Sequence, residues 1–157
     1  MSSGRIEVAL TPSVMPLTRP ILLPDLAATL SAGADLAKEL KAGEVIALVG
    51  DLGAGKTSLT QGIVGALGGG DVTSPTFSLV QEYRTGSLEV YHFDFYRVES
   101  EHELIDLGWD DYLDRDALVI AEWPGRFPDL FPKTTRWLRL SHHESGRLLE
   151  EIPPETH

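Results

Sequence analysis

Apolar residues recur at helical spacing in three stretches of this chain, and each stretch predicts an amphipathic helix. The first covers 25–40, with an Asp at the N-cap position and Gly43 beyond its end as a stop signal. The second runs from about 55 to 67. Its buried stripe consists of Leu59, Ile63, Val64 and Leu67. The third covers 99–113 and is interrupted at Gly108.

Five further stretches have the composition or the alternation of β-strands. Residues 45–50 (VIALVG) and 117–123 (ALVIAEW) are short apolar runs, as in central parallel strands buried on both faces. Residues 77–83 and 88–95 are separated by a short turn that contains Gly, so they predict an antiparallel hairpin. Residues 134–141 (TTRWLRLS) alternate, which predicts an edge strand with one face in water.

This mixture of helices and strands indicates the α/β class, with a mainly parallel sheet and an antiparallel hairpin insertion. Residues 1–20 contain three prolines and little periodicity, which predicts a flexible N-terminal arm. The remainder, 21–157, is expected to form a single domain. A chain of 157 residues with 42% hydrophobic and 24% charged residues suits one such domain.

Composition and charge exclude several functions. Cysteine is absent, which rules out disulfides and thiolate metal sites. No stretch resembles a signal peptide or a membrane span, so we expect a cytoplasmic protein without a membrane partner. The net charge of −11 opposes binding to DNA or RNA and indicates either a solubility feature or an acidic face for a basic protein. A local basic strip leaves room for a tRNA contact: Arg126, Lys133, Arg136 and Arg139.

The stretch GDLGAGKTSL, at 50–59, carries the clearest chemical signal. It fits the pattern G-x-x-x-x-G-K-[ST] and lies between a predicted strand and a predicted helix, as in a phosphate-binding P-loop. Glycines let backbone N–H groups face phosphate oxygens, and the helix N-terminus adds partial positive charge. We expect Lys56 to reach the β- and γ-phosphates and Thr57 to bind Mg²⁺. The predicted nucleotide-binding residues of the loop are Asp51, Leu52, Gly53, Ala54, Gly55, Lys56, Thr57 and Ser58.

Two carboxylates stand at the ends of predicted strands, where a Mg²⁺ site needs them. Asp94 ends EVYHFD, and Glu122 ends LVIAE. Either can bind the ion, directly or through water, while the other orients an attacking water. Asp94, Glu122 and Lys56 are therefore the predicted catalytic residues. The guanine-reading pattern N-K-x-D is absent, so the expected cofactors are ATP or ADP together with Mg²⁺.

Three more motifs follow the loop in order, namely TSPTF at 73–77, HFDFYR at 92–97 and EWP at 122–124. With GDLGAGKT, they make the chain resemble the TsaE family, also called YjeE. These are small bacterial P-loop ATPases required for making threonylcarbamoyladenosine beside the tRNA anticodon. The resemblance runs from about 23 to 132 and implies the three-layer sandwich of P-loop NTPases. One departure is Gly125, where the family commonly has an acidic residue.

The resemblance also implies roles for single residues. It gives Thr57 and Glu122 as the Mg²⁺ ligands and makes Asp94 essential for ATP hydrolysis. It treats SPTF as a switch that depends on the nucleotide. Thr76 in this segment either offers its hydroxyl to the γ-phosphate or its ion, or simply begins a strand. Pro75 supports the first role because it holds the preceding residue in an extended conformation.

Three other motif residues have two competing interpretations each. Trp123 either stacks on a base or a partner, or packs at the edge of the core. Arg97 either lies near a phosphate or an acidic partner, or forms a surface salt bridge. His92 either orients Asp94 or is a half-buried strand histidine. Trp123 and Arg97 complete the predicted nucleotide-binding set.

The resemblance implies that the chain hydrolyses ATP slowly by itself. It would support a TsaB–TsaD protein heterodimer in forming threonylcarbamoyladenosine in tRNAs that read ANN codons. The tRNA is then reached indirectly, through the complex. Two alternatives remain open. One is a small-molecule kinase with Asp94 as base, although no Arg-rich lid segment is evident. The other is a nucleotide-gated interaction module without essential hydrolysis.

Overall fold

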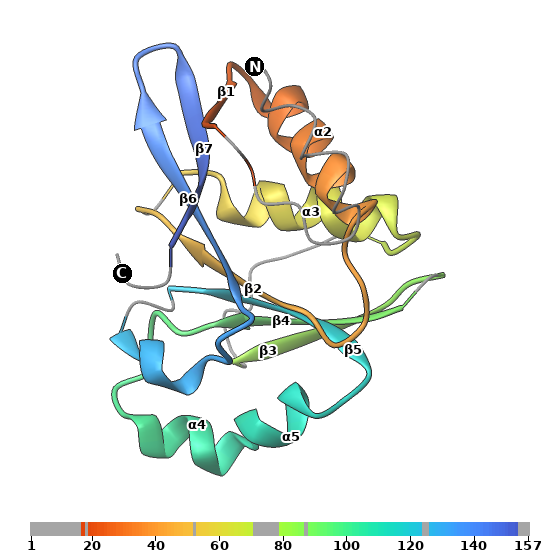
Figure 1. Cartoon of the computed structure of the whole chain (residues 1–157), viewed down its shortest axis with the longest axis vertical. Coiled ribbons are helices and arrows are strands. Elements are labelled where there is room, and N and C mark those ends of the chain that lie inside the picture. The colour runs from red at the N-terminus through yellow and green to blue at the C-terminus, as the bar shows by residue number, and fades with distance from the viewer. Residues whose placement is uncertain are drawn as a thin grey trace, which may run out of the picture.

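Among the residues that the structure describes, seven strands pair into one mixed sheet in the order β1-β7-β6-β2-β5-β4-β3 (Figure 1). The computed structural model describes residues 17, 19–51, 53–70, 79–86, 88–123 and 126–153. The strands are β1 (Ile21–Leu23), β2 (Val45–Val49), β3 (Val80–Arg84), β4 (Glu89–Asp94), β5 (Ala117–Glu122), β6 (Arg136–His143) and β7 (Gly146–Ile152). The helices are α2 (Leu26–Ala37), α3 (Lys56–Ala66), α4 (Glu101–Leu107) and α5 (Trp109–Leu113), with a short 3₁₀ helix at Pro128–Leu130.

The four central strands of the sheet, β6, β2, β5 and β4, are parallel. β3 pairs antiparallel with β4, with Val80 opposite Phe93, so the predicted hairpin is confirmed. β7 and β1 extend the sheet by antiparallel pairing beyond β6. The α/β class is confirmed, and so are the central strands predicted over 45–50 and 117–123, because β2 and β5 lie inside the sheet.

The prediction that 134–141 forms an edge strand is wrong. β6 lies between β2 and β7, and the sheet continues beyond it. The alternation is misleading because Arg136, one of its polar residues, is only 6% exposed. The Arg136 guanidinium donates hydrogen bonds to Glu151 at 2.8 and 3.1 Å and to Glu39 at 3.5 Å. By strand alternation Arg136 shares its face with Leu138 and Leu140, so a buried, paired arginine belongs to the face that packs against α2 and α3.

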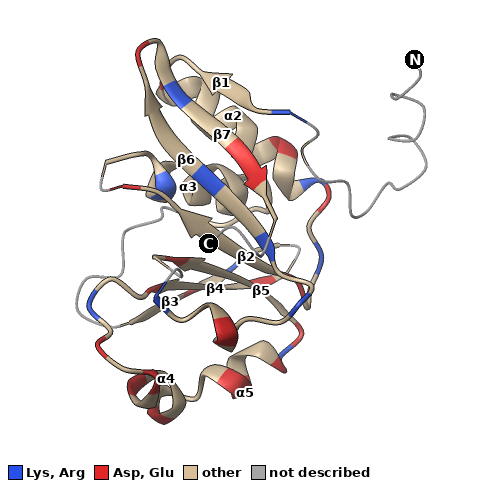
Figure 2. Ribbon diagram, turned by 60° about the vertical axis from the view of Figure 1, so that its left-hand side comes forward, with Lys and Arg blue, Asp and Glu red and all other residues tan. Residues whose placement is uncertain are grey.

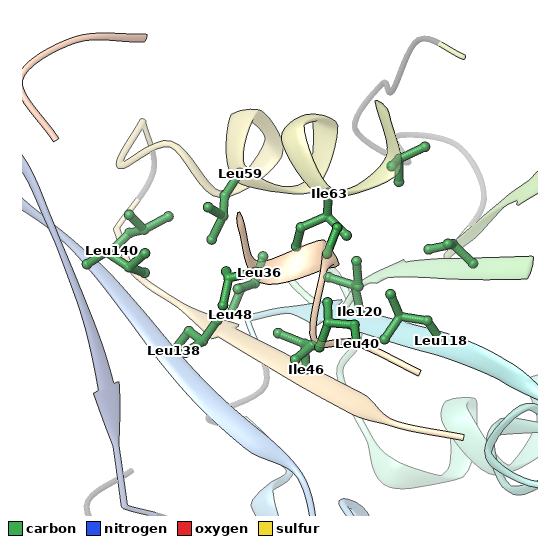
Figure 3. Packing of buried hydrophobic residues seen from close by; sticks show 14 of the residues in the cluster. Leu36, Leu40, Ile46, Leu48, Leu59, Ile63, Leu118, Ile120, Leu138 and Leu140 are labelled. Atoms are coloured by element: carbon green, nitrogen blue, oxygen red, sulfur yellow. The ribbon is translucent and has the colours of Figure 1, made fainter. Parts of the chain in front are cut away.

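Helices cover both faces of the sheet, which makes a three-layer sandwich (Figure 1). α2 and α3 lie on one face, where their apolar side chains meet those of β2, β5 and β6 (Figure 3). α4 and α5 cover a second cluster, which is rich in aromatic side chains. The stripe predicted for α3 is confirmed, since Leu59, Ile63 and Val64 are 0% exposed. Burying each such side chain contributes about 1.5–3 kcal/mol, so α3 is firmly anchored to the sheet.

The helices begin and end close to where the sequence predicts. Asp25 caps α2 by accepting a hydrogen bond from the Ala28 N–H at 2.8 Å. α4 and α5 are the two halves of the helix predicted over 99–113. Gly108 between them has a φ of 92°, which glycine adopts without strain. Leu26, the first residue of α2, is 61% exposed and does not belong to the apolar stripe of the helix.

α2 and α3 cross at two glycines that let their backbones touch. A Cβ atom on Gly33 would meet the Leu59 carbonyl oxygen at 2.5 Å, and one on Gly62 would overlap the Leu30 carbonyl. No side-chain rotation relieves either contact, because the opposing atoms belong to the main chain. Gly33, which weakens the helical pattern in the sequence, is therefore explained by packing.

Charged residues are unevenly distributed over the molecule. Figure 2 shows Asp and Glu gathered on α4 and α5. The basic strip noted in the sequence is partly neutralised, because Arg139 donates to Glu150 at 3.1 Å and Arg136 is paired as described above. Within the described ranges, no helix is both long and apolar enough to cross a membrane.

Replacing Gly62 by Ala should lower the free energy of unfolding by about 1–3 kcal/mol, because α2 and α3 would be overpacked. Gly65→Ala is the matched control on α3, since a Cβ atom there meets nothing within 4 Å. That control should raise stability by about 0.5–1 kcal/mol through helix propensity. Urea unfolding measures both effects, and equal stabilities would contradict the close approach of the two helices.

Candidate functional site

The loop between β2 and α3 lies at the C-terminal edge of the parallel strands. β2 ends at Val49 and α3 begins at Lys56, so the loop joins a buried strand to a helix N-terminus. Gly55 caps the helix with a φ of 105°, a conformation that other residues rarely adopt. Open α/β sheets bind their ligands at this edge, and helix N-termini attract anions. The local backbone thus suits a phosphate chain.

Alternation along β4 and β5 directs three polar side chains to the face covered by α3. In β4, Val90 packs in the cluster beneath α2 and α3, so His92 and Asp94 belong to the same face. In β5, Ile120 packs there, which puts Glu122 on that face as well. Asp94 and Glu122 are direct neighbours in the parallel ladder. Both predicted carboxylates therefore lie side by side.

Lys56, the first residue of α3, is folded back over the loop and is only 5% exposed. Its Nζ donates hydrogen bonds to the carbonyls of Gly50 at 2.5 Å and Asp51 at 3.0 Å. It also lies 4.0 Å from the centre of the Trp123 ring, in a cation–π contact. Burial lowers the pKa of Lys56, while the charge of Glu122 opposes the shift. A phosphate in the loop carries negative charge and can take the place of these neutral partners of Lys56.

Glu122 is 3% exposed and is held by two side chains. His92 Nε2 lies 2.5 Å from Glu122 Oε2, and the Thr57 hydroxyl donates to the same oxygen at 3.5 Å. His92 thus contacts Glu122 rather than Asp94. Within the described part of the chain, the other oxygen, Oε1, makes no hydrogen bond. A carboxylate beside a hydroxyl supplies oxygen donors of the kind that Mg²⁺ prefers.

Asp94 has more open surroundings than Glu122. It is partly exposed, and its Oδ1 accepts a hydrogen bond from the Tyr96 N–H at 2.9 Å. Burial raises the pKa of Asp94; the nearby charge of Glu122 adds to the shift, and the Tyr96 hydrogen bond opposes it. A carboxyl group with a raised pKa at the rim of a site is suited to exchanging protons with water.

These side chains line one hollow of about 270 Å³. Its wall consists of Gly53, Gly55, Lys56, Thr57, Ser58, Asp94, Glu122 and Trp123. All eight belong to the site predicted from the sequence. Of the other predicted residues, Ala54 is buried in the core, and Asp51 and Arg97 are exposed and outside this wall. Leu52 and Thr76 lie outside the described residues.

Trp123 turns the chain at the end of β5. Its φ of 62° is a strained value for a residue other than glycine, worth about 1–3 kcal/mol. The Trp123 N–H bonds to the Leu48 carbonyl at 3.2 Å, which helps to hold this turn. The ring packs on Tyr96 with centroids 5.0 Å apart, and Tyr96 is 57% exposed. The aromatic pair therefore connects the hollow with the surface. Residues 124–125, which follow in the motif, lie outside the described residues.

A second hollow, of about 340 Å³, adjoins the first and shares Gly53, Gly55 and Ser58 with it. β7 contributes to its wall through Arg147, which donates a hydrogen bond to the Gly53 carbonyl at 3.2 Å. The sequence prediction missed Arg147 because it assigned no strand there. The available signal was Glu-Ser-Gly at 144–146, a turn typical of hairpins.

The match to a known family covers the whole site. The family model described as "Threonylcarbamoyl adenosine biosynthesis protein TsaE" matches residues 23–149. The chain belongs to the TsaE family. The TsaE match continues past 132, where the sequence resemblance is expected to end, and it includes β6 and part of β7. The C-terminal hairpin is therefore part of the family fold.

Individual relatives agree with this assignment. Two of these relatives, from Synechocystis sp. and Haemophilus influenzae, both bear the name tRNA threonylcarbamoyladenosine biosynthesis protein TsaE. The relative from Synechocystis sp. is 46% identical over 112 residues, which are 69% of this chain and 71% of that protein. The relative from Haemophilus influenzae is 37% identical over 109 residues, which are 69% of each chain. A crystal structure of YdiB from Bacillus subtilis has a TM-score of 0.68 at 28% identity, covering 85% of this chain and 82% of that one.

TsaE proteins take part in tRNA threonylcarbamoyladenosine biosynthesis, as the family model and both relatives are named for it. The family and the three-layer fold are consistent with a P-loop NTPase. The site described above lies at the sheet edge where such folds bind their ligands.

Asp94→Asn should stabilise the ligand-free protein at pH 7. The folded-state pKa of Asp94 is raised, so the unfolded chain loses this proton first as the pH increases. The folded state therefore loses stability between the ordinary pKa of Asp and the raised value, and at pH 7 the wild type carries the full penalty. Asn carries no charge and can still accept the Tyr96 hydrogen bond.

Urea unfolding at pH 7 and at about pH 3, below the ordinary pKa of Asp, measures this difference. The variant should be more stable at pH 7 and equal to the wild type at the lower pH. Asp106→Asn, at an exposed carboxylate of α4, is the matched control and should change stability by less than about 0.5 kcal/mol. A loss of stability in Asp94→Asn at pH 7 would contradict the analysis of its surroundings.

Proposed function

We propose that this chain is a Mg²⁺-dependent ATP hydrolase that supports the formation of threonylcarbamoyladenosine in tRNA. The observation that carries the proposal is the hollow at the start of α3, where Lys56, Thr57, Asp94 and Glu122 converge. Each of these residue types has a defined task in phosphoryl transfer to water. Membership of the TsaE family supports the pathway.

The two adjoining hollows fit the two ends of a nucleotide. Ser58 contributes to both walls, so one ligand can extend from the first hollow into the second. The phosphates would bind beside Lys56 and Thr57, and the nucleoside would bind beside Thr29 and Arg147. Backbone N–H groups at the start of α3 would donate to phosphate oxygens. Lys56 would leave the carbonyls of the loop and pair with the β- and γ-phosphates. Absence of the guanine-reading pattern favours ATP and ADP.

Thr57 and Glu122 fit a magnesium ion bound to the phosphates. When bound, the ion would neutralise negative charge on the phosphate oxygens. Thr57 would contribute its hydroxyl and Glu122 its carboxylate. Over the described ranges, no group of three or more His, Cys, Asp or Glu side chains is arranged to hold a metal. Water and phosphate would complete the coordination, which is the usual arrangement for Mg²⁺.

The surroundings of the two carboxylates support different roles for them. Glu122 is buried and tied to His92 and Thr57, which suits a fixed metal ligand. Asp94 is partly exposed and has a raised pKa, which suits a group that orients the attacking water and receives its proton. The water oxygen would bond to the γ-phosphorus as the bond to the β–γ bridging oxygen breaks. ADP and inorganic phosphate would leave.

The proposed partner is a TsaB–TsaD-type heterodimer, in keeping with the TsaE family. The net charge of −11 argues against direct binding of tRNA, and ion pairing of Arg136 and Arg139 weakens the local basic strip. The tRNA would then be reached through the complex. Hydrolysis by the isolated chain is expected to be slow, because a site completed by a partner is incomplete alone.

The contact of Lys56 with Trp123 supports a second candidate function, a nucleotide-gated interaction module. Phosphates that draw Lys56 away would change the surroundings of Trp123 and of the exposed Tyr96 that packs on it. A partner that touches this aromatic pair would then sense the nucleotide without hydrolysis. Retention of tRNA modification by Asp94→Asn together with its loss in Lys56→Ala would favour this function over hydrolysis. No comparable contact favours the kinase alternative in the described part of the chain.

Asp94→Asn, although expected to be the more stable protein, should hydrolyse ATP roughly 10²–10⁴-fold more slowly, because the water loses its proton acceptor. ATP hydrolysis is measured with Mg²⁺, for the chain alone and with the TsaB and TsaD proteins of its own organism. Asp106→Asn is again the matched control and should match the wild type. Unchanged turnover in Asp94→Asn, or no turnover by the wild type with its partners, would contradict the proposal.

A further inference from the structure

His92 is a fully buried imidazole in the middle of the sheet. It is 0% exposed and stands between Gln81 of β3 and Ile120 of β5 in the ladder. Val90 on the same face of β4 packs in the apolar cluster beneath α2 and α3. A polar ring in such a place lowers stability relative to an apolar side chain unless its polar atoms are bonded. The hydrogen bonds of its two ring nitrogens therefore indicate the role of His92.

The ring uses one nitrogen, and the bond goes to Glu122. Nε2 lies 2.5 Å from Glu122 Oε2, while Nδ1 is buried without a hydrogen-bond partner among the described residues. A buried N–H without a partner is rarer than a bare acceptor, so we assign the proton to Nε2, which donates to the carboxylate. The Tyr83 ring lies beside the His92 ring, with 6.3 Å between the two centroids.

This bond defines which oxygen of the Glu122 carboxylate is held by the protein and which is left for another ligand. His92 and Thr57 both donate to Oε2, and Oε1 bonds to no residue in the described ranges. Glu is a flexible side chain, and hydrogen bonds to a carboxylate are the stronger kind that can fix its orientation. An apolar residue at position 92 would leave Glu122 buried with only the long 3.5 Å contact to Thr57.

We propose that His92 is a positioning residue, which holds the Glu122 carboxylate so that it can bind Mg²⁺ together with Thr57. The inference rests on the proposed function, because it presupposes an ion at these two side chains. Outer hydrogen bonds commonly orient metal ligands, and losing one typically lowers metal affinity about 10–100-fold. His92 is not among the residues that line the hollow at the start of α3, so its loss should affect nucleotide binding only through the ion.

Three variants of the full chain separate positioning from packing. His92→Leu removes the donor and keeps an apolar side chain. His92→Gln keeps an amide N–H near the position of Nε2. His92→Asn keeps an amide that corresponds to Nδ1 and is too short to reach Glu122, so it repeats the test if the Leu variant fails to fold. Calorimetry measures the affinity of each protein for a non-hydrolysable ATP analogue, across a Mg²⁺ titration and in EDTA.

We expect His92→Leu and His92→Asn to raise the Mg²⁺ concentration for half-maximal effect about 10–100-fold, with affinity in EDTA changed less than about twofold. His92→Gln should recover most of the loss. Wild-type Mg²⁺ dependence in the Leu or Asn variant would overturn the inference. Equal weakening with and without Mg²⁺ in all three would overturn it too, since this indicates a structural role. A wild type whose affinity ignores Mg²⁺ would overturn the proposed function itself.

Discussion

The parallel pairing of β2 with β5 is the constraint on which the site depends. The ladder puts Leu48 opposite Glu122, and the Trp123 N–H bonds to the Leu48 carbonyl at 3.2 Å. Both strands are buried between helical layers, so a slip of one residue would exchange their two faces and move Glu122 away from α3. Core packing thus fixes the position of Glu122 relative to the loop that follows β2, independently of the contacts between side chains of the site.

Several features of the site lower the stability of the folded protein. Asp94 and Glu122 carry like charges in neighbouring strands. Burial raises the pKa of Asp94 and lowers that of Lys56, and both shifts favour the neutral form of the side chain. The strained φ of Trp123 lies at the same edge of the sheet. Unfavourable features gathered at one place, on a well-packed scaffold, are typical of functional sites. A cation beside Glu122 would reduce the repulsion between the two carboxylates. Phosphates beside Lys56 would favour its charged form.

The sequence predicts those parts of the molecule whose environment is set locally. The loop over 50–57 and the apolar strands around it have patterns that depend on near neighbours, and the structure assembles eight predicted residues around one hollow. Strand order depends instead on distant partners. β6 is interior because β2, far away in the sequence, pairs with it on one side and β7 pairs with it on the other, and no local window contains β2. Nor does a local pattern reveal that His92 bonds to Glu122, a residue from another strand.

A crystal structure of the protein grown with Mg²⁺ and a non-hydrolysable ATP analogue tests the central claim most directly. The account predicts phosphates along the backbone of 53–57, Lys56 moved from the Trp123 ring onto them, and the ion bound by Thr57 and Glu122. An analogue bound elsewhere, with Lys56 still on the carbonyls of its own loop, would contradict it. So would an ion held by other side chains, away from Glu122.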